Sequence, residues 1–139
     1  MKIKYTFLII IAVLITNCKP DEHEGKGLKL VNDSSIDVYF YNSEDFTIGH
    51  FSDTILPMEK PLGLQSIIAN GSSGKYVDPN WNQIYSELPE GKFSVYVFSS
   101  EIVDSSPWNE IRANNLVLKR IDLTFEELED SDYTFTYSE

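Results

Sequence analysis

A run of apolar residues close to the N-terminus constrains this sequence more than any other feature. Residues 7–15 contain no polar side chain and follow two lysines, Lys2 and Lys4. This layout is typical of a secretory signal peptide, and the run is well short of the ~20 apolar residues that a membrane-spanning helix requires. We therefore expect residues 1–17 to be a signal peptide, which leaves residues 28–139 as a single small domain behind a short connecting segment.

The only cysteine of the chain, Cys18, lies just behind this run. A single cysteine excludes an internal disulfide, a CxxC redox site and zinc sites built on several cysteines. The sequence Ile15-Thr16-Asn17-Cys18 resembles a bacterial lipobox, in which the cysteine becomes the diacylglyceryl-bearing first residue of the mature protein. We predict that Cys18 is lipidated. The alternative is an ordinary cleaved signal peptide that leaves a free thiol.

The charge of the chain excludes two kinds of partner. The sequence has 11 basic and 22 acidic residues, and its net charge of −11 becomes −13 when residues 1–17 leave, because they contain Lys2, Lys4 and no acid. Such a surface repels both the phosphates of nucleic acids and anionic lipid headgroups. We therefore expect no nucleic-acid partner, and membrane attachment through acyl chains on Cys18, which gain ~0.8 kcal/mol for each buried methylene.

Residues 18–27 connect the predicted anchor to the domain. The segment is polar and contains proline and glycine, so we interpret it as a flexible tether. Its Lys19, followed by the acidic residues of 21–24, is similar to the surface-export signal of Bacteroidetes lipoproteins, which favours display on the cell surface. The sequence Asp-Glu-His-Glu at 21–24 is not expected to bind a metal, because adjacent side chains do not converge on one ion.

Hydrophobic patterning in residues 28–139 predicts an α+β domain with a largely antiparallel sheet. Apolar residues alternate on either side of the turn formers at 32–35, which predicts a β-hairpin with a four-residue loop. Residues 93–98 are apolar on both faces and are expected to form a central strand. Further strands are expected near residues 62–68, 116–123 and 133–137.

Three short helices are predicted from capping signals. The Asp-Pro pair at 78–79 and the Ser-Pro pair at 106–107 each place a proline at the expected first helical position. These helices should end near residues 88 and 114. Thr124 and Glu127 fit a capping box, which predicts a helical turn to about residue 129.

Two short motifs and an aromatic last strand lie in the second half of the chain. The motifs are Trp-Asn-Glu-Ile-Arg at 108–112 and Lys-Arg-Ile-Asp-Leu at 119–123. Together with the turn at 31–35, they resemble a group of small, uncharacterised Bacteroidetes outer-membrane lipoproteins. The resemblance implies a lipid anchor in the outer membrane, and it carries no catalytic or ligand-binding residue to this chain.

Signatures of catalysis are not evident. His50 is the only histidine of residues 28–139, and the sequence has no Gly-x-Ser-x-Gly elbow, P-loop or HExxH motif. We interpret Gly-Ser-Ser-Gly at 71–74 as a turn rather than a nucleophile loop. Residues 78–82 open like a calcium loop, but the required Gly and Glu are missing further along. We expect a protein that is not an enzyme, with no cofactor and no metal.

Two features allow two interpretations each, and a third resembles a modification signal. The neighbouring acids at 126–127 and 130–132 could serve glycoside hydrolysis, although solvated surface is favoured. The aromatic residues at 39, 41, 133, 135 and 137 could form an exposed platform for a sugar or a partner chain, although a core position is favoured. Thr54, within Asp53-Thr54-Ile55, resembles the short acceptor motif for O-glycosylation in Bacteroidetes.

The sequence therefore predicts a membrane-anchored lipoprotein that serves as a non-catalytic binding or structural module of the cell envelope, with an unidentified protein or glycan ligand. The alternative is an acidic inhibitor or immunity-type lipoprotein, because a net charge of −13 would steer a basic partner toward it. A hydrolase built around His50 is a third hypothesis.

Overall fold

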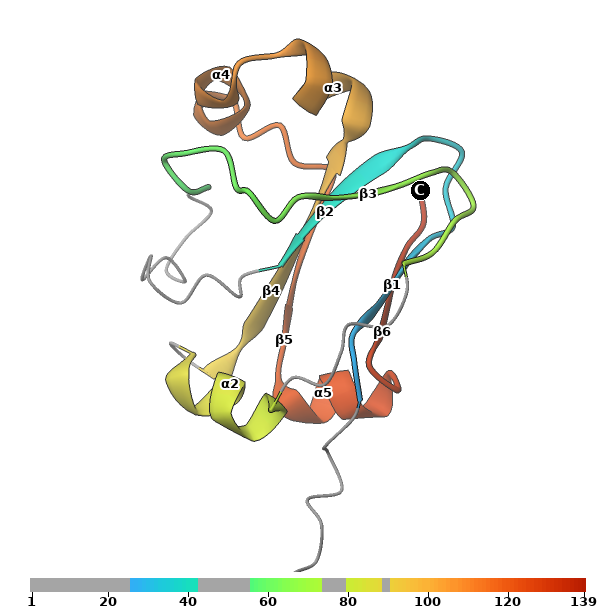
Figure 1. The fold of residues 1–139 in the computed structure, drawn as a ribbon, viewed down its shortest axis with the longest axis vertical. Coiled ribbons are helices and arrows are strands. Elements are labelled where there is room, and N and C mark those ends of the chain that lie inside the picture. The colour runs from blue at the N-terminus through green and yellow to red at the C-terminus, as the bar shows by residue number, and fades with distance from the viewer. Residues whose placement is uncertain (1–25, 43–55, 74–79, 89–90) are drawn as a thin grey trace, which may run out of the picture.

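The computed structural model describes residues 26–42, 56–73, 80–88 and 91–139, which form a single α+β domain (Figure 1). This confirms the predicted fold class. In chain order the elements are β1 (Lys29–Asn32), β2 (Val38–Asn42), β3 (Gln65–Ile67), α2 (Trp81–Glu87), β4 (Phe93–Ser99), α3 (Ser100–Ser105), α4 (Trp108–Ala113), β5 (Lys119–Leu123), α5 (Phe125–Asp130) and β6 (Thr134–Tyr137). No helix in these ranges is long and apolar enough to cross a bilayer.

The larger sheet has four strands in the order β3-β2-β4-β5, and all its neighbouring strands are antiparallel. β4 lies between β2 and β5, as its continuous apolar sequence predicts, and residues 93–98 are all buried. β5 begins at Lys119, three residues after the start expected from the sequence.

The predicted hairpin is wrong. β1 pairs in parallel with β6 at the other end of the chain, with Leu30 opposite Phe135, and these two strands form a separate sheet. The turn formers do reverse the chain, but the fully buried Asn32 binds both the backbone of the turn and that of Ile68, which lies far along the chain. Its Nδ2 donates to the carbonyl oxygens of Ile36 at 2.8 Å and Ile68 at 3.0 Å, so the chain leaves one sheet and enters the other.

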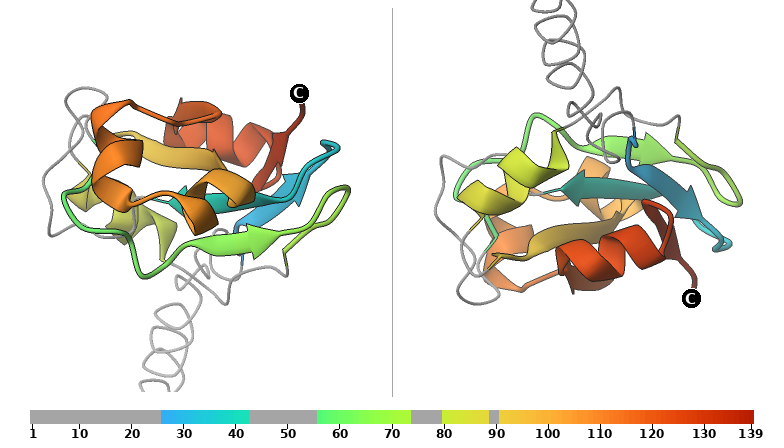
Figure 2. Two further views of the ribbon diagram at one scale, coloured as in Figure 1. Left: turned by 90° about the horizontal axis from the view of Figure 1, so that it is seen from above. Right: turned by 90° about the horizontal axis from the view of Figure 1, so that it is seen from below.

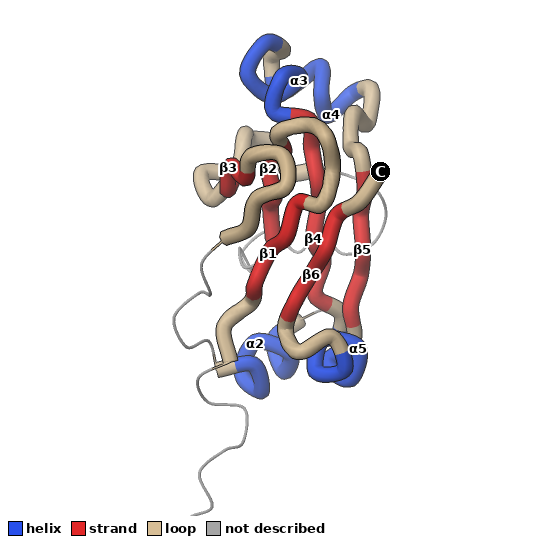
Figure 3. The backbone as a smooth tube through the Cα atoms, turned by 90° about the vertical axis from the view of Figure 1, so that its right-hand side faces the viewer, coloured by secondary structure: helices blue, strands red, loops and turns tan. Residues whose placement is uncertain are grey.

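The β1–β6 pair packs over one face of the larger sheet, in front of β4 in Figure 3. The rings of Phe40 and Phe135 meet edge to face across this layer, with centroids 5.7 Å apart. We call this the inner core, and α2 and α5 close its lower end, where the Tyr85 and Phe125 rings lie 5.1 Å apart (Figures 1 and 2). Its buried members are Leu28, Leu30, Val38, Phe40, Ile67, Trp81, Leu88, Phe93, Val95, Val97, Leu128, Tyr133, Phe135 and Tyr137.

A second cluster, the outer core, lies on the opposite face of the larger sheet. It consists of Leu56, Tyr96, Phe98, Val103 and Ile111, with α3 and α4 covering the upper end of that face (Figures 1 and 2). Because side chains alternate along a strand, β4 supplies Val95 and Val97 to the inner core and Tyr96 and Phe98 to the outer core.

The helices begin differently from the prediction, except for α5. The described part of the chain contains four helices rather than about three, because α3 follows β4 directly. Asn80 caps α2, so the helix starts two residues after the proline expected to open it. Pro107 is the cap residue of α4 rather than its first helical residue, and its carbonyl accepts from the N–H of Glu110 at 3.0 Å. The capping box of α5 is confirmed.

Candidate functional site

The uncovered part of the outer face carries a row of aromatic and charged side chains across three strands. Cross-strand pairing places Tyr41 of β2 beside Tyr96 of β4, and Tyr96 beside Arg120 of β5. The two tyrosine rings have centroids 5.9 Å apart, and the Arg120 guanidinium lies 5.3 Å from the centroid of the Tyr96 ring. A cation over an aromatic face is stabilised by the ring quadrupole, so Tyr96 helps to orient Arg120.

A carboxylate fixes the other side of the same guanidinium. Arg120 Nε donates to Asp122 Oδ1 at 2.8 Å, and the Ser94 hydroxyl donates to the same oxygen at 2.6 Å. Arg120 and Asp122 are two residues apart on one strand and therefore share a face. Within the residues that the structure describes, the terminal Nη groups of Arg120 donate to no protein acceptor.

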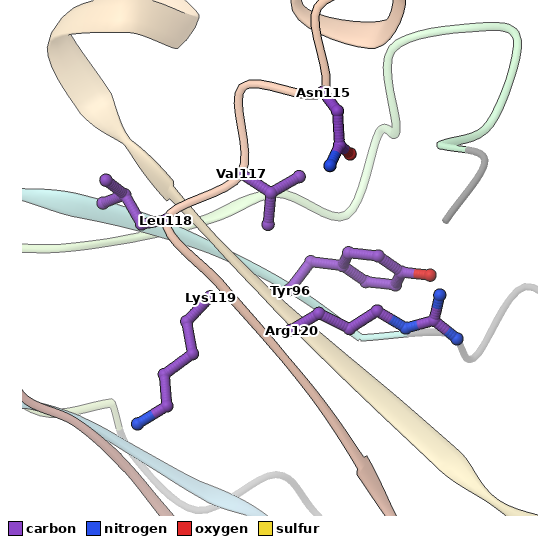
Figure 4. A pocket seen from close by; sticks show the side chains of 6 residues that line it. All are labelled: Tyr96, Asn115, Val117, Leu118, Lys119 and Arg120. Carbon is purple, nitrogen blue, oxygen red and sulfur yellow. The ribbon is translucent and has the colours of Figure 1, made fainter. Parts of the chain in front are cut away.

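Tyr96 and Arg120 line a pocket of about 180 Å³, which we call the Arg120 pocket (Figure 4). Its lining residues are Tyr96, Asn115, Val117, Leu118, Lys119 and Arg120. In Figure 4 the side chains of Asn115, Val117, Tyr96 and Arg120 lie on one side of β5, whereas Lys119 points to the opposite side. The pocket thus combines an amide, a guanidinium and a phenol with an apolar wall.

The end of α4 sets the position of Asn115. The N–H of Leu116 donates to the carbonyl of Ile111 at 2.9 Å, and the N–H of Asn115 donates to the carbonyl of Arg112 at 3.3 Å. This is a Schellman motif, which requires a left-handed residue, and Asn115 supplies it with φ +48°. Leu116 and Ile111 meet in the outer core, which completes the motif. The Asn115 backbone is therefore held firmly, while its side-chain amide forms no hydrogen bond within the described ranges.

Burial keeps the Tyr96 phenol neutral. The pKa of Tyr96 is raised mainly because burial disfavours the phenolate, and the Asp122 carboxylate raises it further while the Arg120 guanidinium lowers it. A neutral phenol is a poor general base at neutral pH. The chemistry that this arrangement supports is hydrogen bonding and charge pairing with a bound group.

A second pocket of about 310 Å³ lies at the upper end of the sheet. It is lined by Ser35, Ile36, Asp37, Ser99, Ser100 and Glu101. Its polar groups already serve the fold, because Asp37 Oδ1 accepts from the N–H of Ala69 at 2.8 Å and the Asp37 carbonyl accepts from Ser100 at 3.1 Å. The Arg120 pocket has the stronger case as a binding site because, in the described residues, the Nη groups of its guanidinium and the Asn115 amide are not used in this way.

The aromatic residues singled out in the sequence divide between the two cores. Tyr133, Phe135 and Tyr137 are buried in the inner core and form no exposed platform. Tyr39 and Tyr41 are half-buried against the outer core, and the Tyr39 hydroxyl donates to Asp104 Oδ1 at 3.1 Å. That hydrogen bond is the main reason why the pKa of Tyr39 is raised. The favoured core interpretation is confirmed for the last strand.

Three further motifs have structural roles in the described residues. Asn80 Oδ1 accepts from the N–H of Gln83 at 3.1 Å, so this oxygen of the calcium-like segment caps α2. In the Gly-Ser-Ser segment, Ser73 Oγ accepts from the N–H of Leu30 at 2.9 Å and so ties the turn to β1. Glu127 is the acidic member of the α5 capping box. In the described ranges, no group of three or more His, Cys, Asp or Glu side chains could hold a metal ion.

Several predicted residues lie outside the part of the chain that the structure describes. These are Cys18 and the signal peptide, His23 of the tether, His50, Thr54 and Asp78. Lipidation, O-glycosylation and the hydrolase hypothesis around His50 therefore stay predictions.

Sequence reasoning did not find the Arg120 pocket. A partial signal was present, because the two-residue spacing of Arg120 and Asp122 on a predicted strand places both side chains on one face. The contribution of Asn115 depends on how α4 ends, and no short motif encodes it. Comparisons with protein-family models, with curated proteins and with solved structures found no significant match to this chain.

Proposed function

We propose that this protein is a lipid-anchored, non-catalytic binding module of the bacterial outer membrane, held by acyl chains on Cys18 and binding its ligand in the Arg120 pocket. The anchor rests on the apolar run at 7–15 and the lipobox-like sequence that ends at Cys18. The binding site rests on the Arg120 guanidinium. Asp122 and Tyr96 orient it, and its Nη groups stay available to a ligand.

The observation that carries this proposal is the separation between the start of the domain and the pocket. Lys26 is fixed at the α2–α5 end, where its carbonyl accepts from the indole N–H of Trp81 and its Nζ lies 5.2 Å from the ring centroid of Tyr133. The Arg120 pocket lies instead where α4 leads into β5, toward the opposite end (Figure 1).

An anchor at Cys18 would keep the α2–α5 end close to the membrane. The eight residues from Cys18 to Lys26 can span at most roughly 28 Å, at ~3.5 Å per residue. The pocket would then face away from the bilayer and be open to ligands. This orientation suits a binding module better than an enzyme acting on lipid.

Replacement of the anchor residue tests the first half of the proposal. Cys18→Ala is expected to move the protein from the membrane fraction to the soluble fraction, and mass spectrometry of the wild-type membrane protein should find Cys18 acylated. Ser35→Ala, an exposed substitution on the domain, is the control and should leave the protein in the membrane fraction. Cofractionation of Cys18→Ala with membranes to the wild-type extent would rule out the acyl anchor.

The acidic surface supports a second candidate function, capture of a basic partner. Four of the six residues of α5 are acidic, and Asp132 follows the helix closely. Such capture would weaken steeply with salt, because exposed charges are screened beyond ~8 Å at physiological ionic strength. Binding of a basic protein should therefore weaken with salt and survive Arg120→Gln, whereas binding in the Arg120 pocket should be lost in that variant.

A further inference from the structure

We infer that the Arg120 pocket binds a single carboxylate group, carried by a small acid or by the end of a larger ligand. This inference rests on the proposed function, since it names the chemical class that the same pocket recognises. The orientation of the guanidinium, the amide beside it, the volume of the pocket and the negative charge close by all favour this ligand.

The orientation of Arg120 suits a planar anion. Its Nε edge is occupied by Asp122 at 2.8 Å and its face lies 5.3 Å from the Tyr96 ring centroid, so the side chain has little freedom to rotate. The Nη edge is left as a fork of parallel donors. Carboxylates bind such a fork through two hydrogen bonds, and a donor that is oriented in advance loses less entropy on binding.

Asn115 supplies a second donor from the opposite side of the pocket. In Figure 4 its side-chain amide points toward the space above Tyr96 and Arg120. The left-handed φ of +48° fixes its backbone, so this donor is also held in place before a ligand arrives. An anion between a guanidinium and an amide can accept hydrogen bonds from both.

The volume limits what can enter. A volume of about 180 Å³ is small beside pockets for drug-sized ligands, which begin near ~300 Å³. The pocket can therefore hold one charged group and the few carbon atoms next to it. Val117, on the same side of β5 as Tyr96 and Arg120 in Figure 4, provides apolar contact for those carbons.

The nearby charge favours a monoanion over a dianion. Asp122 bonds directly to Arg120, and the protein as a whole is strongly acidic. A second negative charge on the ligand would be repelled by Asp122, and the other basic residue that lines the pocket, Lys119, points to the opposite side of β5 (Figure 4). A carboxylate therefore fits better than a phosphate, although guanidinium groups bind both.

Titrations of the ¹⁵N-labelled full chain in a non-ionic detergent test this inference. The side-chain Nε–H resonance of Arg120 and the amide of Asn115 are the reporters. Sodium galacturonate should shift both in a saturable manner, whereas galactose, which has the same ring without a carboxylate, should not. N-acetylglycine tests a chain-terminal carboxylate, so comparison of the two acids distinguishes a sugar acid from a peptide end. Inorganic phosphate should bind more weakly than the better of the two acids.

Matched variants tie the binding to the pocket. Arg120→Gln should weaken binding of the better acid by about tenfold or more, because a charge-assisted bidentate pair is lost. Asn115→Gly should weaken it several-fold without harming the helix end, since glycine suits the left-handed position. Lys92→Gln removes one positive charge from an exposed residue just before β4, outside the pocket lining, and should stay within about twofold of wild type. Unchanged urea midpoints would confirm that these variants fold.

Three results would overturn the inference: equal shifts with galactose and galacturonate, tighter binding of phosphate than of either acid, or wild-type binding by Arg120→Gln. None of these results would bear on the anchor at Cys18, which the fractionation experiment tests separately. Loss of the anchor would conversely leave the ligand titrations unaffected.

Discussion

Asn32 shows how one polar side chain can set the path of the chain. It is fully buried, its amide donates to three backbone carbonyls, and its Oδ1 accepts from the Ser34 hydroxyl at 2.6 Å. Because buried polar groups without partners are costly, this network permits only one conformation of the turn between β1 and β2. Asn32 thereby directs β1 into the smaller sheet and β2 into the larger one.

Replacement of Asn32 by leucine, which has a similar volume, should lower the free energy of unfolding by about 2–3 kcal/mol, since it leaves buried carbonyls without donors. The urea midpoint should fall with an unchanged m-value. Asn109→Ala, at an exposed position on α4, is the control and should stay within about 0.5 kcal/mol of wild type. Equal midpoints for the two variants would show that the Asn32 network does not stabilise the fold.

Gly71 marks a second position where one residue type is required. A Cβ atom there would lie 2.8 Å from the backbone oxygen of Ile68 and 2.9 Å from its Cγ1. Gly71→Ala should therefore cost about 1–3 kcal/mol through local overpacking. At Gly63 nothing lies within 4 Å of the same atom, so Gly63→Ala should be neutral or stabilise by up to about 1 kcal/mol. Thermal unfolding of both variants checks the contrast, and a Gly71→Ala protein as stable as Gly63→Ala would contradict it.

At the scale of elements, α5 depends on its capping box. Glu127 Oε2 accepts from the N–H of Thr124 at 2.8 Å and from its hydroxyl at 3.0 Å, and Thr124 Oγ1 accepts from the N–H of Glu127 at 3.3 Å. The hydrogen bond from the Thr124 backbone is the main cause of the lowered pKa of Glu127, and the hydroxyl adds to it. Thr124→Ala should cost about 1 kcal/mol, as loss of an N-cap usually does.

The same capping box gives α5 a pH dependence of definite sign. Because the Glu127 pKa is lower in the folded state than its ordinary 4.5, the folded protein binds fewer protons, and the stabilisation is complete above that value. It is lost as the pH falls through the lowered pKa. Glu127→Gln should therefore be less stable than wild type at pH 7, and the difference should shrink below pH ~4. Denaturant unfolding across this range measures it, and Glu126→Gln on the same helix, outside the capping box, should show no such convergence.

The elements also show which parts of the fold the sequence encodes locally. Alternating apolar residues predicted β2 and β4, and the Thr124–Glu127 spacing predicted the start of α5, because each signal lies within one element. The pairing of β1 with β6 could not be predicted, since the two strands lie at opposite ends of the domain and no local pattern in either strand encodes its partner. α3 was missed because Ser99 makes no side-chain capping bond and the helix has only six residues.

The candidate site depends on still longer-range structure. Arg120 and Asp122 share a face through strand geometry, which the sequence indicates, but Tyr96 reaches them only through the pairing of β4 with β5. Asn115 joins them because α4 ends in a left-handed residue. A site assembled from three separate segments leaves no single motif in the sequence, so it emerges only in the folded chain.

At the scale of the whole molecule, the two cores share one sheet. β4 contributes alternate side chains to both, so a displacement of this strand disturbs the packing on its two faces together. The net negative charge of the chain destabilises the compact fold, because acidic side chains on the surface repel one another. Cohesion of the domain therefore comes from the buried layers rather than from surface ion pairs.

The two tryptophans of the chain allow this coupling to be measured. Trp81 lies in the inner core, and Trp108 packs against the outer core, where its indole N–H donates to the carbonyl of Pro57 at 2.9 Å. In Trp81→Phe and Trp108→Phe, the remaining tryptophan reports on one core alone. Each substitution should lower stability by about 1–3 kcal/mol. In both variants the urea transition followed by fluorescence should nevertheless coincide with that followed by far-ultraviolet circular dichroism, because a single cooperative domain unfolds in one step.

If Trp108 fluorescence changed at lower urea than the dichroism, α3 and α4 would unfold before the sheet. The Arg120 pocket, which begins where α4 ends, would then be less stable than the domain that carries it.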